Sequence, residues 1–149
     1  MRIILDTNVF VSGVFFSGPP YEILDAWRQG RLTLVVSPEI LNEYERVGQK
    51  LAKEFPAVDL APSLELLAFK GEVVQAPPLA EQVCSDRDDD MFLACAVASG
   101  TRVISSGDKA LRQTSGYAGV EVLNLREFVE KYLKKRSQTH AGDGKPRAR

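Results

Sequence analysis

The chain has 149 residues, of which 44% are hydrophobic and 26% charged, which suffices for one buried core and is too few for two. It contains no run of eighteen apolar residues, and its first apolar run ends at once at Asp6, so we expect neither a membrane span nor a secretory leader, and hence a cytoplasmic protein. The only histidine, His140, lies near the C-terminus, which argues against histidine-dependent catalysis or a histidine-rich metal site. Cys84 and Cys95 lack a pairing motif and are predicted to be ordinary buried thiols.

The charges are segregated along the chain. Residues 1–130 carry 12 Lys/Arg and 19 Asp/Glu, a net charge of −7, whereas residues 131–149 carry 7 and 1, a net charge of +6. The basic end shows no apolar periodicity, so we expect a folded domain over residues 1–133 and a disordered basic tail over 134–149. Two roles remain open for this tail: electrostatic contact with a phosphate backbone, or simply keeping the protein in solution.

In the first half of the chain, apolar runs alternate with helical patterns. Residues 2–5 are predicted to form a buried strand, and a helix is expected to follow Pro20. Residues 32–36 are rich in β-branched side chains and predict a second strand. Ser37 supplies an N-cap and Pro38 a first-turn proline for the clearest amphipathic helix of the chain.

The second half continues the alternation. Residues 55–80 are less regular, with a short helical patch around Leu67 and a possible strand at 73–74. The run 91–98 is apolar on all sides and is followed by Gly100, which predicts a fully buried helix with a glycine stop.

Two more strands and a helix complete the pattern. Strands are expected at 103–105 and 120–123, and Asn124 with Glu127 forms a capping box for a last helix. Such alternation predicts an α/β fold with three α/β/α layers around a mostly parallel central sheet.

Acidic residues follow the predicted strands. Asp6 comes directly after the first strand, and Asp108 follows strand 103–105. Open parallel sheets gather their working groups at the carboxyl ends of the strands, so these two side chains are expected to meet. Glu43 lies at the border of the apolar stripe of its helix, from which it either points toward Asp6 or joins an ion pair on the solvated face; both remain open.

The segment 86–90 contains four aspartates in five residues. Acidic residues at a helix start each contribute roughly 0.3–1 kcal/mol through the helix dipole. Four carboxylates so close together repel one another, however, unless a cation is near. With the acids at the strand ends, this segment predicts a carboxylate cluster that a divalent cation keeps ionised.

Four segments in this order resemble the motifs of one known family, the PIN domain. They are Leu5-Asp6-Thr7-Asn8-Val9, then Ser37-Pro38-Glu39-Ile40-Leu41-Asn42-Glu43-Tyr44, then Asp86-Arg87-Asp88-Asp89-Asp90-Met91-Phe92-Leu93-Ala94, and finally Ser105-Ser106-Gly107-Asp108-Lys109-Ala110-Leu111. The resemblance spans about residues 2–133 and is closest to short stand-alone prokaryotic PIN proteins, the VapC-like toxins of toxin–antitoxin pairs. It implies a metal-dependent ribonuclease with three or four acids in its site, a homodimer, and a small antitoxin protein as partner.

The resemblance also assigns the acids of the site. Asp6, Glu43 and Asp108 match the family's acids directly. The third acid falls within the aspartate run, where Asp90 ranks first because it fits the register of the buried helix face, Asp89 ranks second and Asp86 third. The implied catalytic and metal-binding set is therefore Asp6, Glu43, Asp90 and Asp108, with Asp89 as a further ligand.

Further residues are assigned supporting roles. The Ser106 hydroxyl is expected to hydrogen-bond one of the carboxylates, and Asn8 to orient Asp6 or a metal-bound water. Candidates for holding the RNA strand, each also explicable as an ordinary core or surface residue, are Arg87, Lys109 and Arg112, with Phe16 or Tyr21 as stacking surfaces.

This inventory suits one chemistry best. An all-oxygen ligand set selects Mg²⁺ or Mn²⁺, and one such ion, or two about 3.5–4 Å apart, would activate water for attack on single-stranded RNA. Two alternatives stay open: a catalytically silent PIN-like module that binds RNA or protein, and a phosphotransfer domain. A phosphatase of the latter kind needs a second acid where this chain has Asn8, and a receiver needs an aspartate after strand 73–74, where none occurs.

Overall fold

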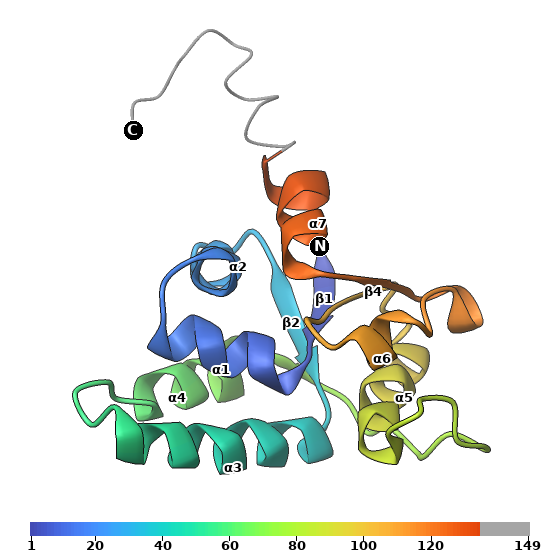
Figure 1. Ribbon diagram of the computed structural model, residues 1–149, viewed down its shortest axis with the longest axis horizontal. Coiled ribbons are helices and arrows are strands. Elements are labelled where there is room, and N and C mark those ends of the chain that lie inside the picture. Colours follow the sequence, from blue (N-terminus) through green and yellow to red (C-terminus); the bar gives the residue numbers. More distant parts are fainter. Residues whose placement is uncertain (135–149) are drawn as a thin grey trace, which may run out of the picture.

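The computed structural model describes residues 1–134, which form one five-stranded sheet with helices on both faces (Figure 1). The strand order is β3-β2-β1-β4-β5, and all four pairings are parallel. The strands are β1 (Arg2–Leu5), β2 (Thr33–Val36), β3 (Glu72–Val73), β4 (Val103–Ser105) and β5 (Glu121–Leu123). The predicted three-layer α/β/α fold is thus confirmed, while the predicted basic tail lies outside the described residues except for Lys134.

The helices alternate with these strands. They are α1 (Thr7–Phe15), α2 (Pro19–Arg28), α3 (Pro38–Glu54), α4 (Ala61–Lys70), α5 (Asp90–Ser99), α6 (Lys109–Arg112) and α7 (Leu125–Phe128). Short 3₁₀ turns occupy Arg87–Asp89 and Tyr117–Gly119, and α7 continues as a π-helical segment over Val129–Lys134. In Figure 1, α3 runs along the lower edge with α1 above it, α5 stands to the right and α7 at the top.

Local sequence signals explain where several helices begin and end. The Ser37 hydroxyl accepts a hydrogen bond from the Ile40 amide at 3.2 Å and so caps α3, as predicted. The capping box that starts α7 also forms as predicted. Helix α5 ends where Gly100 adopts a left-handed conformation (φ 73°), which a glycine accepts without steric cost.

The order of the strands creates a switch point between β1 and β4. From β1 the chain moves outward to β2 and β3, and it then crosses back to β4 on the other side of β1. Helices that follow strands on the two sides of such a point diverge, which opens a crevice at the carboxyl ends of the strands. Asp6 follows β1 directly, and Asp108 lies three residues beyond the end of β4, so both lie at this crevice.

A buried aromatic group fixes α3 against this end of the sheet. The rings of Phe10 and Tyr44 stack with centroids 4.3 Å apart, and Trp27 packs edge-on against Phe10 at 6.4 Å. Such pairs add about 0.5–1.5 kcal/mol beyond burial alone. The Tyr44 hydroxyl donates a hydrogen bond of 2.6 Å to the carbonyl of Leu5, the last residue of β1. Helix α3 is therefore tied to the strand end from which Asp6 emerges.

Two features differ from the sequence prediction. Helix α1 was not expected, because its residues are apolar around most of the helix and give no amphipathic period. Six of its nine residues are buried, and it packs against α2 and α3. The prediction that the helix over 91–98 is fully buried is wrong at its end, where Val97 is 49% exposed and Ala98 is exposed.

Both cysteines are buried free thiols, as predicted. Within residues 1–134, no helix has the length and apolar character needed to cross a membrane.

Candidate active site

A cavity of about 540 Å³ opens at the switch point, outside the carboxyl ends of β1 and β4. Its walls come from the β1–α1 junction, α3, the 3₁₀ turn that precedes α5, and the β4–α6 connection. Six carboxylates line it, which is why we call it the acidic cavity: Asp6, Glu43, Asp86, Asp88, Asp89 and Asp108. Among residues 1–134, no Lys or Arg side chain lines this cavity.

Asp6 is both the cap of α1 and the most buried acid of the cavity. Its side chain is held from two sides: the Val9 amide donates to Oδ1 at 3.0 Å, and the Ser106 hydroxyl donates to Oδ2. The residue is only 5% exposed. Burial raises the pKa of Asp6, and these hydrogen bonds offset only part of that rise. The carboxylate is fixed in position while remaining costly to ionise.

Ser106 links the two acids that follow the central strands. The residue is fully buried, donates its hydroxyl hydrogen to Asp6 and accepts a hydrogen bond of 2.9 Å from the Asp108 amide. Asp108 in turn caps α6, because its Oδ1 accepts from the Ala110 amide at 2.9 Å. One hydroxyl therefore sets the relative positions of both acids, in agreement with the supporting role predicted for Ser106.

Asp89 lines the acidic cavity, where its carboxyl group lies beside that of Asp108. Its Oδ2 is buried and makes no hydrogen bond within the described part of the chain. Burial, together with the neighbouring carboxylate of Asp108, raises the pKa of Asp89 to about 7. A buried acceptor without a donor costs about 1–3 kcal/mol, so this position is unfavourable unless a cation or a proton compensates.

The structure does not bring Asp90 together with the other acids. Its two oxygens accept hydrogen bonds from the backbone amides of Val83 (3.0 Å) and Cys84 (2.7 Å). Although burial acts to raise the pKa of Asp90, these amides hold it below its usual value. Asp90 therefore anchors the connection before the 3₁₀ turn. The acids of this segment that line the cavity are Asp86, Asp88 and Asp89, and Asp89, which the sequence ranked second, is the most buried of them.

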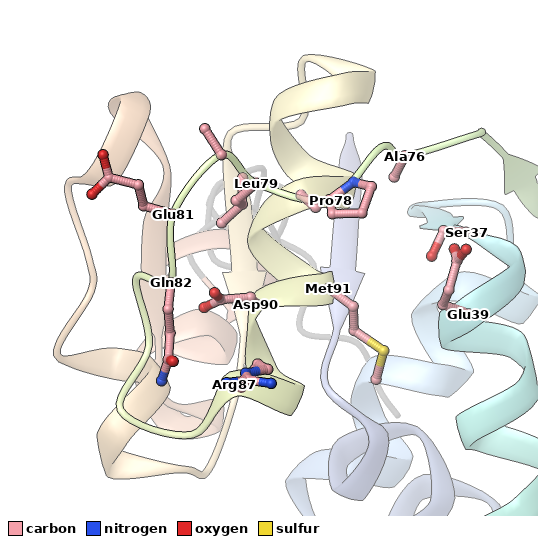
Figure 2. A pocket seen from close by; sticks show the side chains of 12 residues that line it. Ser37, Glu39, Ala76, Pro78, Leu79, Glu81, Gln82, Arg87, Asp90 and Met91 are labelled. Carbon is pink, nitrogen blue, oxygen red and sulfur yellow. The ribbon is translucent and has the colours of Figure 1, made fainter.

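Asp90 instead lines a second cavity, of about 440 Å³, which we call the side pocket (Figure 2). Its walls are formed by Ser37 and Glu39 at the start of α3, residues of the segment 76–82, and Arg87, Asp90, Met91 and Ala94.

Glu43 takes both of the positions that the sequence left open. It lines the acidic cavity, and its carboxylate also pairs with Arg46 one turn along α3, at 2.7 Å. The hydrogen bond from Arg46 lowers the pKa of Glu43. Because the Arg46 side chain is 55% exposed, this pair contributes little to stability and is easily exchanged.

The donor set fits a hard divalent cation. Every polar group that faces the cavity from Asp6, Glu43, Asp89 and Asp108 is a carboxylate, the kind of ligand that Mg²⁺ and Mn²⁺ prefer. The partnerless Oδ2 of Asp89 is a free ligand atom. In the conformation of residues 1–134 described here, no three acidic, histidine or cysteine side chains already stand close enough to hold one ion together.

Some cavity residues were missed by the sequence reasoning or assigned differently. Asn8 lines the cavity, as its predicted role requires. Thr7 and Asp88 also line it although neither was singled out, and the Thr7 hydroxyl is buried without a partner among the described residues. Both residues could have been identified from the sequence, because Thr7 follows Asp6 and Asp88 precedes Asp89 in the motifs.

The candidates for holding RNA lie elsewhere. Arg87 lines the side pocket, and Lys109 and Arg112 belong to α6 behind Asp108. Neither Phe16 nor Tyr21 lines the acidic cavity.

Comparison with known proteins supports the fold and the motifs. A family model described as "PIN domain" matches residues 2–110, a range that includes every acid of the cavity. Ten chains of solved structures match; one is the crystal structure of PAE2754 from Pyrobaculum aerophilum, with a TM-score of 0.57 and 15% sequence identity, covering 89% of this chain and 96% of that one. At this identity the likeness concerns the fold alone. No curated protein matches the chain significantly.

Proposed function

The chain belongs to the PIN-domain family, whose fold is of nuclease type, and from this premise we propose that it is a Mg²⁺- or Mn²⁺-dependent endoribonuclease that hydrolyses phosphodiester bonds of single-stranded RNA. The observation that carries the proposal is the acidic cavity at the switch point of the sheet. The carboxylates of Asp6, Asp89 and Asp108 all line it, and no Lys or Arg among the described residues lines it with them. One of their oxygens is buried without a hydrogen-bond partner in residues 1–134. A structural role does not explain such an arrangement, because it costs stability.

Each acid has a distinct part in this proposal. Asp6, fixed by Ser106 and the Val9 amide, is the rigid ligand, and Asp108 is positioned by the same serine. Asp89 supplies the free oxygen, and Glu43 joins when it leaves Arg46. We therefore assign the third acid to Asp89 and give Asp90 a structural role.

The metal supplies the reactive chemistry. When bound by these carboxylates, Mg²⁺ or Mn²⁺ would lower the pKa of a water for hydrolysis of the phosphodiester bond and would offset the charge that develops on the leaving 3′ oxygen. The protein contributes the orientation of the carboxylates and a cavity open to solvent on the side from which an RNA strand approaches.

The finer identity rests on the motif resemblance. We propose the VapC-like subtype, in which the chain is the toxin of a toxin–antitoxin pair, forms a homodimer and is neutralised by a small antitoxin protein. Light scattering of the purified chain tests the dimer. Co-expression that restores growth of cells producing the chain tests a candidate antitoxin.

A second candidate function is favoured by one observation. The Glu43 carboxylate is occupied by Arg46, and no three potential ligands within residues 1–134 stand at positions that hold an ion. A PIN-like module that binds RNA or protein without cleaving would show these features. The family match favours both of these functions over the phosphotransfer alternative.

The test is cleavage of a labelled mixed-sequence single-stranded RNA by the purified full-length chain, with Mg²⁺, Mn²⁺ or EDTA. Asp6→Asn is the inactive variant, because asparagine keeps an oxygen to cap α1 while it removes the charge and replaces the oxygen that accepts from Ser106. Asp25→Asn, a surface change on α2, is the matched control. Metal-dependent cleavage that Asp6→Asn loses and Asp25→Asn retains supports the nuclease. If folded protein that binds Mn²⁺ cleaves no RNA, the silent module is the better description.

A further inference from the structure

The side pocket adjoins the acidic cavity and shares its supporting helices. Glu39 and Glu43 lie four residues apart on α3, which is about 6 Å along the helix axis, and they line the side pocket and the acidic cavity respectively. Likewise, Asp89 lines the acidic cavity and Asp90 lines the side pocket, while Met91 lines both. The two sites therefore lie next to each other and share the side chain of Met91.

The walls of the side pocket are mostly apolar. Pro78 and Leu79 of the connection between β3 and the 3₁₀ turn face Met91 and Ala94 of α5 across it. Figure 2 shows Gln82, Asp90 and Arg87 on one side of the hollow, Glu39 on the other and Met91 between them. Apolar walls with a few polar groups at the edge are typical of sites that enclose a flat ring.

The polar groups of the side pocket that are free to bind a ligand are mainly hydrogen-bond acceptors. The Gln82 amide nitrogen donates to the carbonyls of Cys84 (2.8 Å) and Ser85 (3.3 Å), which leaves its side-chain oxygen available. The Glu39 carboxylate makes no hydrogen bond or ion pair with any other described side chain. Both oxygens of Asp90 are already used by backbone amides.

Within the described part of the chain, one cationic side chain, that of Arg87, lines the side pocket. Arg87 lies between Asp86 and Asp88 in the 3₁₀ turn; those two aspartates line the acidic cavity, whereas Arg87 lines the side pocket. It forms no ion pair within 4.0 Å among the described residues. A guanidinium at this position could bind the phosphate of an RNA strand that passes from the side pocket to the acidic cavity.

We propose that the side pocket is a nucleobase subsite that binds the base next to the scissile phosphate and prefers guanine. The proposal rests on the proposed ribonuclease function, and it names a specificity determinant for that function. Guanine offers N1–H and an N2 amino group to a single carboxylate, here that of Glu39, whereas uracil presents one N–H between two carbonyl oxygens that a carboxylate repels. Met91 and Leu79 enclose the faces of the ring, and Arg87 contacts the phosphate.

The subsite is tested by binding, so that its outcome does not depend on cleavage. Fluorescence anisotropy measures the Kd of the full-length protein for 5′-labelled decamers of uridine that contain one central guanosine, adenosine or cytidine, or none. Ca²⁺ replaces Mg²⁺, and a gel verifies that each probe stays intact. We expect the guanosine probe to bind about tenfold more tightly than the all-uridine probe, the effect of one good bidentate contact.

Two variants and a control make the test specific. Glu39→Gln is expected to reduce the guanosine preference to about twofold or less, while the Kd for all-uridine RNA stays within about twofold. Gln82→Ala, an exposed position, is expected to weaken the preference independently, should Glu39→Gln disturb the start of α3. Glu45→Gln, also an exposed glutamate of α3 but not one lining either cavity, is expected to change nothing. Photo-crosslinking with 6-thioguanosine is expected to label Met91 or the segment 76–82.

The outcomes separate the subsite from the nuclease. Equal binding of all four probes, a preference that survives in both variants, or crosslinks outside these residues would overturn the subsite and leave metal-dependent cleavage untouched. A guanosine preference that follows the predicted variants, in protein that cleaves no RNA with any metal, would support the subsite and overturn the nuclease. Folded protein that binds none of the probes would overturn both.

Discussion

Asp89 and Asp90 are neighbours in the chain, yet their carboxylates have opposite surroundings. Asp89 faces the acidic cavity, where burial and Asp108 raise its pKa to about 7 and one oxygen has no partner among the described residues. Asp90 faces the connection before the 3₁₀ turn, where the amides of Val83 and Cys84 satisfy both oxygens. A negative charge on Asp89 therefore destabilises the fold, whereas a negative charge on Asp90 stabilises it.

The comparison separates a site for chemistry from a site for structure. Carboxylates that the protein itself satisfies hold backbone in place, and those that it leaves unsatisfied are available to a ligand. The same division holds for the two cavities, since Asp90 shapes the side pocket by anchoring its wall while Asp89 contributes a free oxygen to the acidic cavity. Substitutions that remove one charge at a time should therefore give opposite results.

Asp89→Asn should have the largest effect on activity. Removing a metal ligand is expected to lower metal-dependent cleavage by at least about a hundredfold, since even outer partners of ligands are worth 10–100-fold. Asp88→Asn, an exposed neighbour at the rim of the same cavity, is the matched control and should lose far less. Similar losses in the two variants would indicate that the general negative charge of the cavity matters rather than this ligand.

The same substitution should stabilise the metal-free protein. Because the pKa of Asp89 is raised to about 7 in the folded state, its ionised form lowers stability at pH 8. This cost decreases as the pH falls from about 7 to about 4, and it is absent below about 4, where the carboxyl is protonated in both states. In EDTA, Asp89→Asn should thus have a higher Tm than wild type at pH 8 and an equal Tm near pH 4. Thermal unfolding followed by circular dichroism measures both, and a lower Tm at pH 8 would mean that the carboxylate is satisfied.

Ser106→Ala should come next in size. Its hydroxyl positions Asp6 and accepts from the Asp108 amide, so we expect cleavage to fall by about 10–100-fold and the free energy of unfolding by about 1–3 kcal/mol. Ser105→Ala, whose buried hydroxyl has no partner in the described chain, is the control and should be close to neutral in activity. Equal activity of the two variants would remove Ser106 from the account.

Asp90→Asn should show the reverse of Asp89→Asn. An asparagine places an amide donor against one of the two backbone N–H groups, so the free energy of unfolding should drop by about 1–3 kcal/mol. Cleavage at a temperature where the variant is folded should remain within about tenfold of wild type. Urea denaturation gives the stability, and loss of activity equal to that of Asp89→Asn would restore Asp90 as the catalytic acid.

Arg46→Ala should have the smallest effect on stability and metal binding. It tests Glu43, which both lines the acidic cavity and pairs with an arginine. The exposed ion pair is worth at most about 1 kcal/mol, so stability should hardly change. Freed from Arg46, Glu43 becomes available to a cation, and the affinity for Mn²⁺ should rise slightly. Weaker Mn²⁺ binding would show that the arginine supports the site.

The sequence was most informative where a residue determines the conformation of the backbone next to it. Ser37, Asn124 and Gly100 predicted helix boundaries correctly because capping and left-handed turns depend on local chemistry. Asp6 and Asp108 were placed at one crevice because parallel strands bring their ends together. The rank of Asp90 over Asp89 rested on its spacing from Ser106 and on the register of the buried helix face. Neither can show that the amides of Val83 and Cys84, several residues upstream, turn back to bind that carboxylate. The side pocket escaped prediction for the same reason, since the irregular segment 76–82 forms one of its walls.

The most direct test of the division between these two aspartates is Mn²⁺ binding, measured by electron paramagnetic resonance on wild type, Asp89→Asn and Asp90→Asn under conditions where all three are folded. We predict that wild type and Asp90→Asn bind Mn²⁺ with similar affinity and that Asp89→Asn binds at least about tenfold more weakly. The opposite order, with binding lost in Asp90→Asn and kept in Asp89→Asn, would contradict the assignment of the acidic cavity as the metal site.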